Sequence, residues 1–286
     1  MKLFLLVWTS AAGLSTALFA ENVKGMEDVQ RLYADTNYSA VVNRLQGATD
    51  APSLRLLGRG YLMMNDLKRA SDTLEKAVGA DPKNSEGYLW LGRAYGMRAQ
   101  NAMAISAASL AIKTRENFER AYALDARNWD AAGDLFEFYL QAPVFMGGGL
   151  DKASRMADAL VVHDAAEGAV AHARVAERRK DFQTAEKQFR TAIQIAPDQA
   201  ARHVDLAQFF AHRGRFAESD AEFAQAFQSS PNSAKIMYAR ADTLIQTNRN
   251  LPEAKQLLTR YLALKLTPDD PPRQDAEKLL RKVSGS

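Results

Sequence analysis

The chain from residue 51 to residue 82 alternates apolar and polar positions with the period of two short helices. Apolar residues recur every three or four positions, at Leu54, Leu57 and Tyr61 and then, after a polar turn, at Ala70, Leu74 and Ala77. This spacing places each group of three on one face of a helix. Gly58 lies where the two helices must approach closely, and Pro82 lies where it would end the second helix. The pattern therefore predicts a helix hairpin.

The same order of positions recurs along the chain. The pattern of the first helix returns at Tyr88, Leu91, Gly92 and Tyr95. The pattern of the second helix is found at residues 185–197 and again, 34 positions later, at residues 219–231. A constant spacing of this kind is what the stacking of one hairpin on the next requires.

This order of large, small, aromatic and proline positions resembles the tetratricopeptide repeat, whose signature recurs every 34 residues. Leu54 stands in place of the tryptophan of that signature, and Leu74 stands in place of its phenylalanine. The resemblance covers about residues 26–268. It implies an all-α, right-handed superhelical solenoid of antiparallel helix hairpins, and it says little about activity.

The first twenty residues differ in kind from the rest. Lys2 precedes an almost uninterrupted apolar run over residues 3–18, which is the layout of a secretory signal peptide and favours an exported bacterial protein. Cleavage is expected after Ala20, with Ala17 as the alternative, and an uncleaved anchor is the other interpretation. We expect a periplasmic or secreted protein with no transmembrane segment after signal cleavage.

The remaining chain divides into three parts. Residues 21–50 form a degenerate opening repeat that caps the stack, residues 51–268 form the solenoid, and residues 269–286 form a C-terminal capping helix and tail. Within the solenoid, residues 85–128 predict an enlarged hairpin and residues 141–150 a long loop. Insertions in successive repeats tend to lie on one face, which is often the binding face.

Composition excludes several classes of site and partner. The 286 residues contain no cysteine, which removes disulfides and thiolate metal sites. Hydrophobic residues make up 47% of the chain, enough to build a core along a solenoid. The formal charge is +3, and loss of Lys2 with the signal brings the chain closer to balance. Charge alone therefore gives no reason to expect nucleic acid as a partner.

The sequence offers no convergent catalytic or cofactor-binding set. The run Gly147-Gly148-Gly149 precedes a helix but lacks the lysine and serine or threonine of a phosphate-binding loop, so a turn is the favoured interpretation. The four histidines fall in two pairs nine positions apart, on opposite faces of a helix, at His163, His172, His203 and His212. We therefore predict no catalytic residue, no cofactor and no metal.

Candidate binding residues follow from the resemblance. Proteins of this family line their concave surface mainly with first helices, at positions two, five, nine and twelve of each repeat. On this chain those positions select Arg55, Arg59, Leu62, Met63, Leu89, Arg93, Met97, Glu137, Leu140, Arg174 and Arg178. Guanidinium groups grip carboxylates and methionines adapt their shape, which suits an acidic, partly apolar peptide. The alternative is that the arginines form intramolecular ion pairs that keep the groove soluble.

A second candidate surface is the apolar loop that contains Phe145 and Met146. A loop of this composition either packs under the neighbouring hairpin, which is the default, or meets a partner.

From the repeats, the signal-like segment and the groove residues together, we expect a non-catalytic scaffold of the cell envelope that binds a peptide or a partner protein on its concave face. An envelope glycan or polymer binder and a self-assembling structural protein are the alternatives, and an enzyme with a cryptic site has the least support.

Overall fold

The structure is a computed structural model that describes residues 25–284, and this part of the chain is helical without a strand. The predicted all-α solenoid of antiparallel hairpins is confirmed. The predicted signal peptide lies outside the described residues. After a helix over residues 25–34, the helices are α2 (Tyr38–Leu45), α3 (Ala51–Met63), α4 (Leu67–Ala80), α5 (Ser85–Gln100), α6 (Ala104–Leu124), α7 (Trp129–Gln141), η1 (Val144–Met146), α8 (Leu150–His163), α9 (Ala165–Arg178), α10 (Phe182–Ile195), α11 (Ala200–His212), α12 (Phe216–Ser229), α13 (Ala234–Gln246), α14 (Leu251–Ala263) and α15 (Arg273–Ser284).

Local sequence signals explain where many of these helices begin. Asp50 caps α3 by accepting a hydrogen bond from the Ser53 amide, and Asn84 caps α5 in the same way through the Gly87 amide. Short polar side chains at this position satisfy backbone donors that have no partner within the helix. Pro52 stands in the first turn of α3, where its missing amide hydrogen costs nothing. The helix boundaries are thus encoded locally.

The hairpins are held together by close contacts at small residues. A Cβ atom on Gly58 of α3 would lie 2.5 Å from the Leu74 side chain of α4, and one on Gly92 of α5 would lie 2.5 Å from the Phe118 ring of α6. These distances leave no room for a side chain, so the glycines let each second helix place its large apolar residue directly against the first helix. Gly58 thus lies where the two helices approach closely, as its position in the sequence pattern predicts.

Five of the turns inside hairpins share a residue in the left-handed region. It occupies the second position after the first helix, at Thr36, Asn65, Lys180, Gly214 and Asn248. The α5–α6 and α7–α8 hairpins are built differently. Helices α5 and α6 have 16 and 21 residues, longer than the 13 or 14 of most others, and residues 142–149 between α7 and α8 include the short helix η1.

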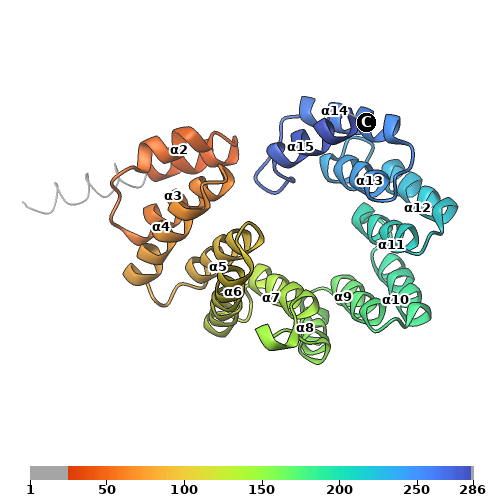
Figure 1. Ribbon diagram of the computed structural model, residues 1–286, viewed down its shortest axis with the longest axis horizontal. Coiled ribbons are helices and arrows are strands. Elements are labelled where there is room, and N and C mark those ends of the chain that lie inside the picture. Colours follow the sequence, from red (N-terminus) through yellow and green to blue (C-terminus); the bar gives the residue numbers. More distant parts are fainter. Residues whose placement is uncertain (1–24, 285–286) are drawn as a thin grey trace, which may run out of the picture.

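The hairpins curve around an open centre, with the first helix of each hairpin on the inside of the curve (Figure 1). Buried clusters run along the stack without a break, since helices α5, α9, α11 and α13 each contribute to the clusters on both sides. The curvature brings the connection between α14 and α15 back toward the N-terminal repeat (Figure 1). There Lys265 Nζ lies 2.9 Å from Asp35 Oδ1.

Candidate functional site

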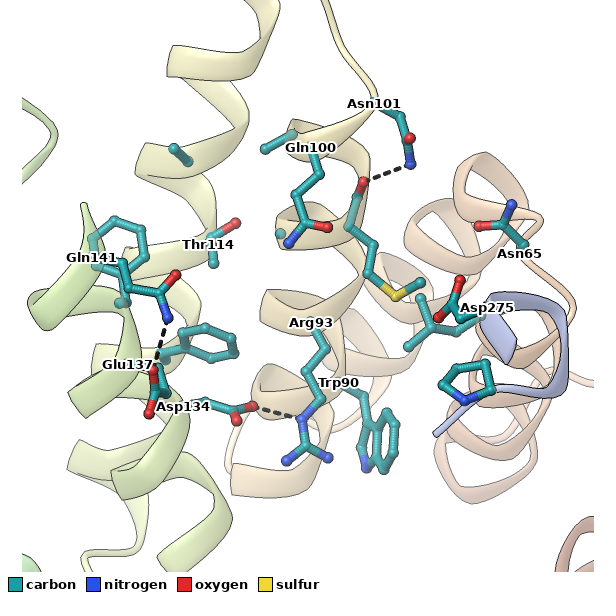
Figure 2. Close-up of a pocket in the computed structure, with 18 of the residues that line it drawn as sticks. Asn65, Trp90, Arg93, Gln100, Asn101, Thr114, Asp134, Glu137, Gln141 and Asp275 are labelled. Atoms are coloured by element: carbon teal, nitrogen blue, oxygen red, sulfur yellow. Dashed lines mark hydrogen bonds and ion pairs between the residues drawn. The ribbon is translucent and has the colours of Figure 1, made fainter. Parts of the chain in front are cut away.

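The inner face of the solenoid contains a cavity of about 960 Å³. Helices α5, α6 and α7 form its main wall, joined by the end of α3 and by the connection after α7 (Figure 2). Residues between Pro268 and Arg281, from the C-terminal end of the chain, line it as well. The cavity is therefore bounded by segments that lie far apart in the sequence.

Six of the residues predicted from the sequence line this one cavity. They are Leu62, Met63, Arg93, Met97, Glu137 and Met146. Leu89 has no exposed surface and packs in the core, so it is not available for contact with a partner. Phe145 does not line the cavity and stays 80% exposed. The predicted residues thus divide among the cavity, the core and the outer surface.

Arg59 belongs to a stack of rings and guanidinium groups that spans three helices. Its guanidinium carbon lies 4.4 Å from the centre of the Tyr33 ring and 4.3 Å from that of Trp90. Arg93 covers Trp90 as well, at 4.7 Å. Cation–π contacts of this kind stabilise most when they are shielded from water. Because two arginines contact the Trp90 ring system, we expect it to be a poor platform for stacking a sugar.

Arg93 also binds carboxylates of the next hairpin. Its Nε lies 2.6 Å from Asp134 Oδ2, and its Nη2 lies 3.8 Å from Asp130 Oδ1. Burial raises the pKa of Asp134, while the charge of Arg93 and their hydrogen bond oppose that rise. Figure 2 shows this pair on the cavity wall, between α5 and α7. The Arg93 guanidinium is therefore already engaged by partners within the protein.

The remaining arginines of the predicted groove fall into two groups. Arg174 of α9 forms a two-point ion pair with Glu137 of α7, in which Nη2 donates to Oε2 at 2.8 Å. Arg55 and Arg178 make no ion pair within residues 25–284. At Arg93 and Arg174 the structure thus matches the alternative considered from the sequence, in which the arginines pair within the chain.

The lining of the cavity also contains five amide side chains, to which no signal in the sequence pointed. Asn65, Gln100, Asn101, Gln141 and Gln274 line it. Asn101 donates to the Met97 carbonyl at 3.1 Å and Gln141 to Glu137 at 2.8 Å (Figure 2). The charged lining residues nearly balance, with the cations of Arg93, Lys278 and Arg281 against the carboxylates of Asp134, Glu137, Asp270 and Asp275. The cavity is polar without being basic.

The glycine run is a structural turn. The amide of Gly147 donates to the Val144 carbonyl, that of Gly148 to Pro143 at 3.2 Å, and that of Gly149 to Tyr139 at 2.8 Å. A Cβ atom on Gly148 would overlap the Ala142 carbonyl. Since all three amides are already used, they are not free to bind a phosphate.

The histidines have separate partners in separate places. His203 lies 2.6 Å from Glu222, His172 lies 3.2 Å from Asp158 and His212 lies 3.6 Å from Glu177, while the His163 ring stacks on Trp129. Residues 25–284 contain no group of three metal-binding side chains. In the same range, no helix combines the length and the apolar composition that crossing a membrane requires.

Solved structures share this fold. The chain is similar to a tetratricopeptide repeat protein from Parabacteroides merdae, with a TM-score of 0.61, 13% identity, and 91% of this chain and 98% of that chain covered. It is also similar to a chain of the APC/C hetero-tetramer Cut9-Hcn1, with a TM-score of 0.51, 16% identity, and 89% of this chain and 48% of that chain covered. No family model and no curated protein matches the sequence. The likeness shows the tetratricopeptide repeat fold.

Proposed function

We propose that the chain is a non-catalytic scaffold that binds an extended segment of a partner protein in the cavity between α5, α7 and the C-terminal residues. A preformed cavity supports this function because the receptor loses little conformational freedom when a segment docks. The repeat fold agrees with it, since stacked hairpins present long concave surfaces suited to protein partners.

The lining indicates what such a segment would look like. Amide side chains both donate and accept hydrogen bonds, so they can pair with the backbone of an extended peptide. Met63, Met97 and Met146 supply apolar surface that adjusts to different side chains. Because Arg93 and Arg174 already bind carboxylates, the cavity gives no added reason to require an acidic partner. We propose a partner segment with apolar side chains and a small net charge.

Peptides selected from a random library on the purified protein would test this proposal. Met97→Glu places a charge against the apolar wall, and we expect it to weaken binding of a selected peptide by about tenfold or more. Arg55→Glu is the control, because Arg55 does not line the cavity and makes no ion pair in the described chain. Fluorescence anisotropy would measure both affinities. Equal binding by Met97→Glu and the unaltered protein would exclude the cavity as the peptide-binding site.

We also propose that the protein acts in the cell envelope, after export and cleavage of residues 1–20. The support is the basic start and apolar run of this segment. N-terminal sequencing of the protein recovered from a fractionated bacterium should begin at Glu21. Recovery of the chain with residues 1–20 in the cytoplasmic fraction would contradict export.

A further inference from the structure

The enlarged α5–α6 hairpin carries an exposed apolar surface that the cavity does not use. Met103 and Ile105 at its tip are 85% and 91% exposed, and Ile112 two turns further along α6 is 38% exposed. Residues 99–112 contain no charged side chain, although a quarter of the chain is charged. Apolar surface of this kind usually marks a contact with another molecule.

These residues form a stripe on the outer side of α6. Ile105, Ala108, Ser109 and Ile112 follow the spacing i, i+3, i+4 and i+7, which places them on one face of the helix. Leu110, Thr114 and Phe118 lie on the opposite side, where Thr114 and Phe118 are buried. The stripe therefore faces away from the solenoid's own core.

The stripe is symmetric about its own midpoint. Residues 105–112 read Ile-Ser-Ala-Ala-Ser-Leu-Ala-Ile, with an isoleucine at each end and small residues at the centre. When two such helices cross in opposite directions about a two-fold axis at the midpoint, Ile105 of each copy meets Ile112 of the other. Small residues at the crossing let the helices approach closely. A two-fold contact requires this self-complementarity, whereas a contact with an unrelated partner does not.

The charges around the stripe fit the same arrangement. The nearest cation, Lys113, would face the partner copy near its uncharged Ala104, so the two-fold contact brings no like charges together. The short helix η1 lies beside α6 just past the end of the stripe, where Arg115 Nη1 donates to the Met146 carbonyl at 3.2 Å. Its Val144 and Phe145 are each 80% exposed and add apolar area beside α6.

We propose that two copies of this chain associate through the outer face of α6, with residues 105–112 crossing antiparallel about a two-fold axis and Val144 and Phe145 at the edge of the contact. This surface lies outside the cavity lining except at Ala111, so association leaves the cavity open. It differs from end-to-end stacking of hairpins, because it buries the side of one enlarged hairpin and closes at two copies.

Analytical ultracentrifugation of the full chain over a wide range of concentrations tests this proposal. We expect a monomer–dimer equilibrium, and Ile105→Lys should weaken the dimer by about tenfold or more. Val162→Lys is the matched control, since Val162 on α8 is 84% exposed and lies outside the stripe, and it should leave the equilibrium unchanged. Circular dichroism would verify that each variant keeps its helices.

A pair of double variants tests the crossing itself. In the antiparallel arrangement, Ile105→Lys combined with Ile112→Glu places a lysine opposite a glutamate at both ends and should restore the dimer. Ile105→Lys combined with Ile112→Lys should abolish it. A protein that stays monomeric at every concentration, including one that binds lipid vesicles through this face, would overturn the proposal. So would a dimer that Ile105→Lys leaves intact, or one that the lysine–glutamate pair fails to restore.

Discussion

The two halves of the inner face are built from equivalent helices but stabilised by different interactions. From the N-terminal repeat to α5, the inner helices are tied by the stack of Tyr33, Arg59, Trp90 and Arg93. From α9 onward they are tied by ion pairs. Arg202 of α11 contacts Glu167 of α9 at 2.8 Å and Asp205 of its own helix at 3.3 Å.

The pattern of ion pairs continues toward the C-terminal end. Arg240 of α13 binds Asp220 of α12 at 2.5 Å and Glu253 of α14 at 3.0 Å, and its side chain is 9% exposed. His212 of α11 lies near Glu177 of α9, which raises the pKa of the histidine. In this half, most inner charged groups have a partner within the protein.

The difference shows how one repeat architecture separates stability from recognition. Ion pairs in the second half use up the charges that a ligand would need. In the first half, the aromatic stack orders the helices while leaving an amide such as Gln100 without a hydrogen-bonding partner in the described chain. This contrast is why we place the binding site near α5 and α7 and not along the whole inner face.

Among the substitutions that test this contrast, the largest loss of stability is expected at Arg202. Its side chain is 10% exposed, and Arg202→Ala leaves the carboxylates of Glu167 and Asp205 without their cation. Removing one partner of a buried ion pair is strongly destabilising, and we expect a loss of about 3 kcal/mol in the free energy of unfolding. Urea denaturation followed by circular dichroism would measure it.

The matched change in the first half is Arg55→Ala. Because Arg55 makes no ion pair in the described chain, we expect a change within about 0.5 kcal/mol. Equal losses from the two substitutions would show that the ion pairs of Arg202 contribute nothing beyond the arginine side chain itself.

A smaller effect concerns the pH dependence of stability. Burial raises the pKa of Asp205 to about 7, although Arg202 and Arg174 oppose the rise and Glu167 adds to it. An unfolded aspartate titrates near its ordinary value of about 4, so the folded state binds the proton more tightly. Between these two values the folded state holds more protons, and the stability contributed by this group falls as the pH rises.

Asp205→Asn removes that titration. Relative to this variant, the unaltered protein should lose about 2 kcal/mol in the free energy of unfolding between pH 5 and pH 8, allowing for the part of the carboxyl that still meets water. Urea denaturation of both proteins at the two pH values gives the difference. Parallel pH dependence in the two proteins would mean that Asp205 is already ionised at pH 5.

The sequence predicted most of the fold because the signals that define a repeat are local. Gly58 and Leu74 are 16 positions apart, inside one hairpin, and their contact follows from the repeat pattern. The methionines Met63 and Met97 were found in the same way, since they occupy inner positions of their own helices. Contacts within a repeat could therefore be predicted from one chain without a structure.

Contacts between repeats could not be predicted, because they depend on how far each hairpin rotates on the last. Arg93 and Asp134 are 41 positions apart, and no local signal shows whether a groove arginine will reach a carboxylate or stay free. The contribution of residues 268–281 to the cavity depends on the summed curvature of the whole stack. A small rotation at each repeat decides whether that segment reaches α3 and α5.

The smallest effect on stability, and the most informative about the cavity, is expected where the ends of the solenoid meet. Asp35 and Lys265 are 59% and 81% exposed, so water screens their ion pair and Lys265→Glu should leave unfolding unchanged. The substitution places a second negative charge beside Asp35 and should widen the gap between the ends. Since the chain has no cysteine, spin labels at Ser39→Cys and Gln274→Cys report that distance without background.

Lys255→Glu is the control for this measurement. Lys255 is exposed on α14 and forms no ion pair in the described chain, so the same change of charge there should not alter the distance between the labels. A longer and broader distance distribution for Lys265→Glu alone would show that an exposed ion pair, too weak to stabilise the fold, still sets the width of the cavity. Identical distributions for both variants would mean that the packing of the hairpins sets that width without the ion pair. The second half would then affect the binding site only through the curvature of its stacked hairpins.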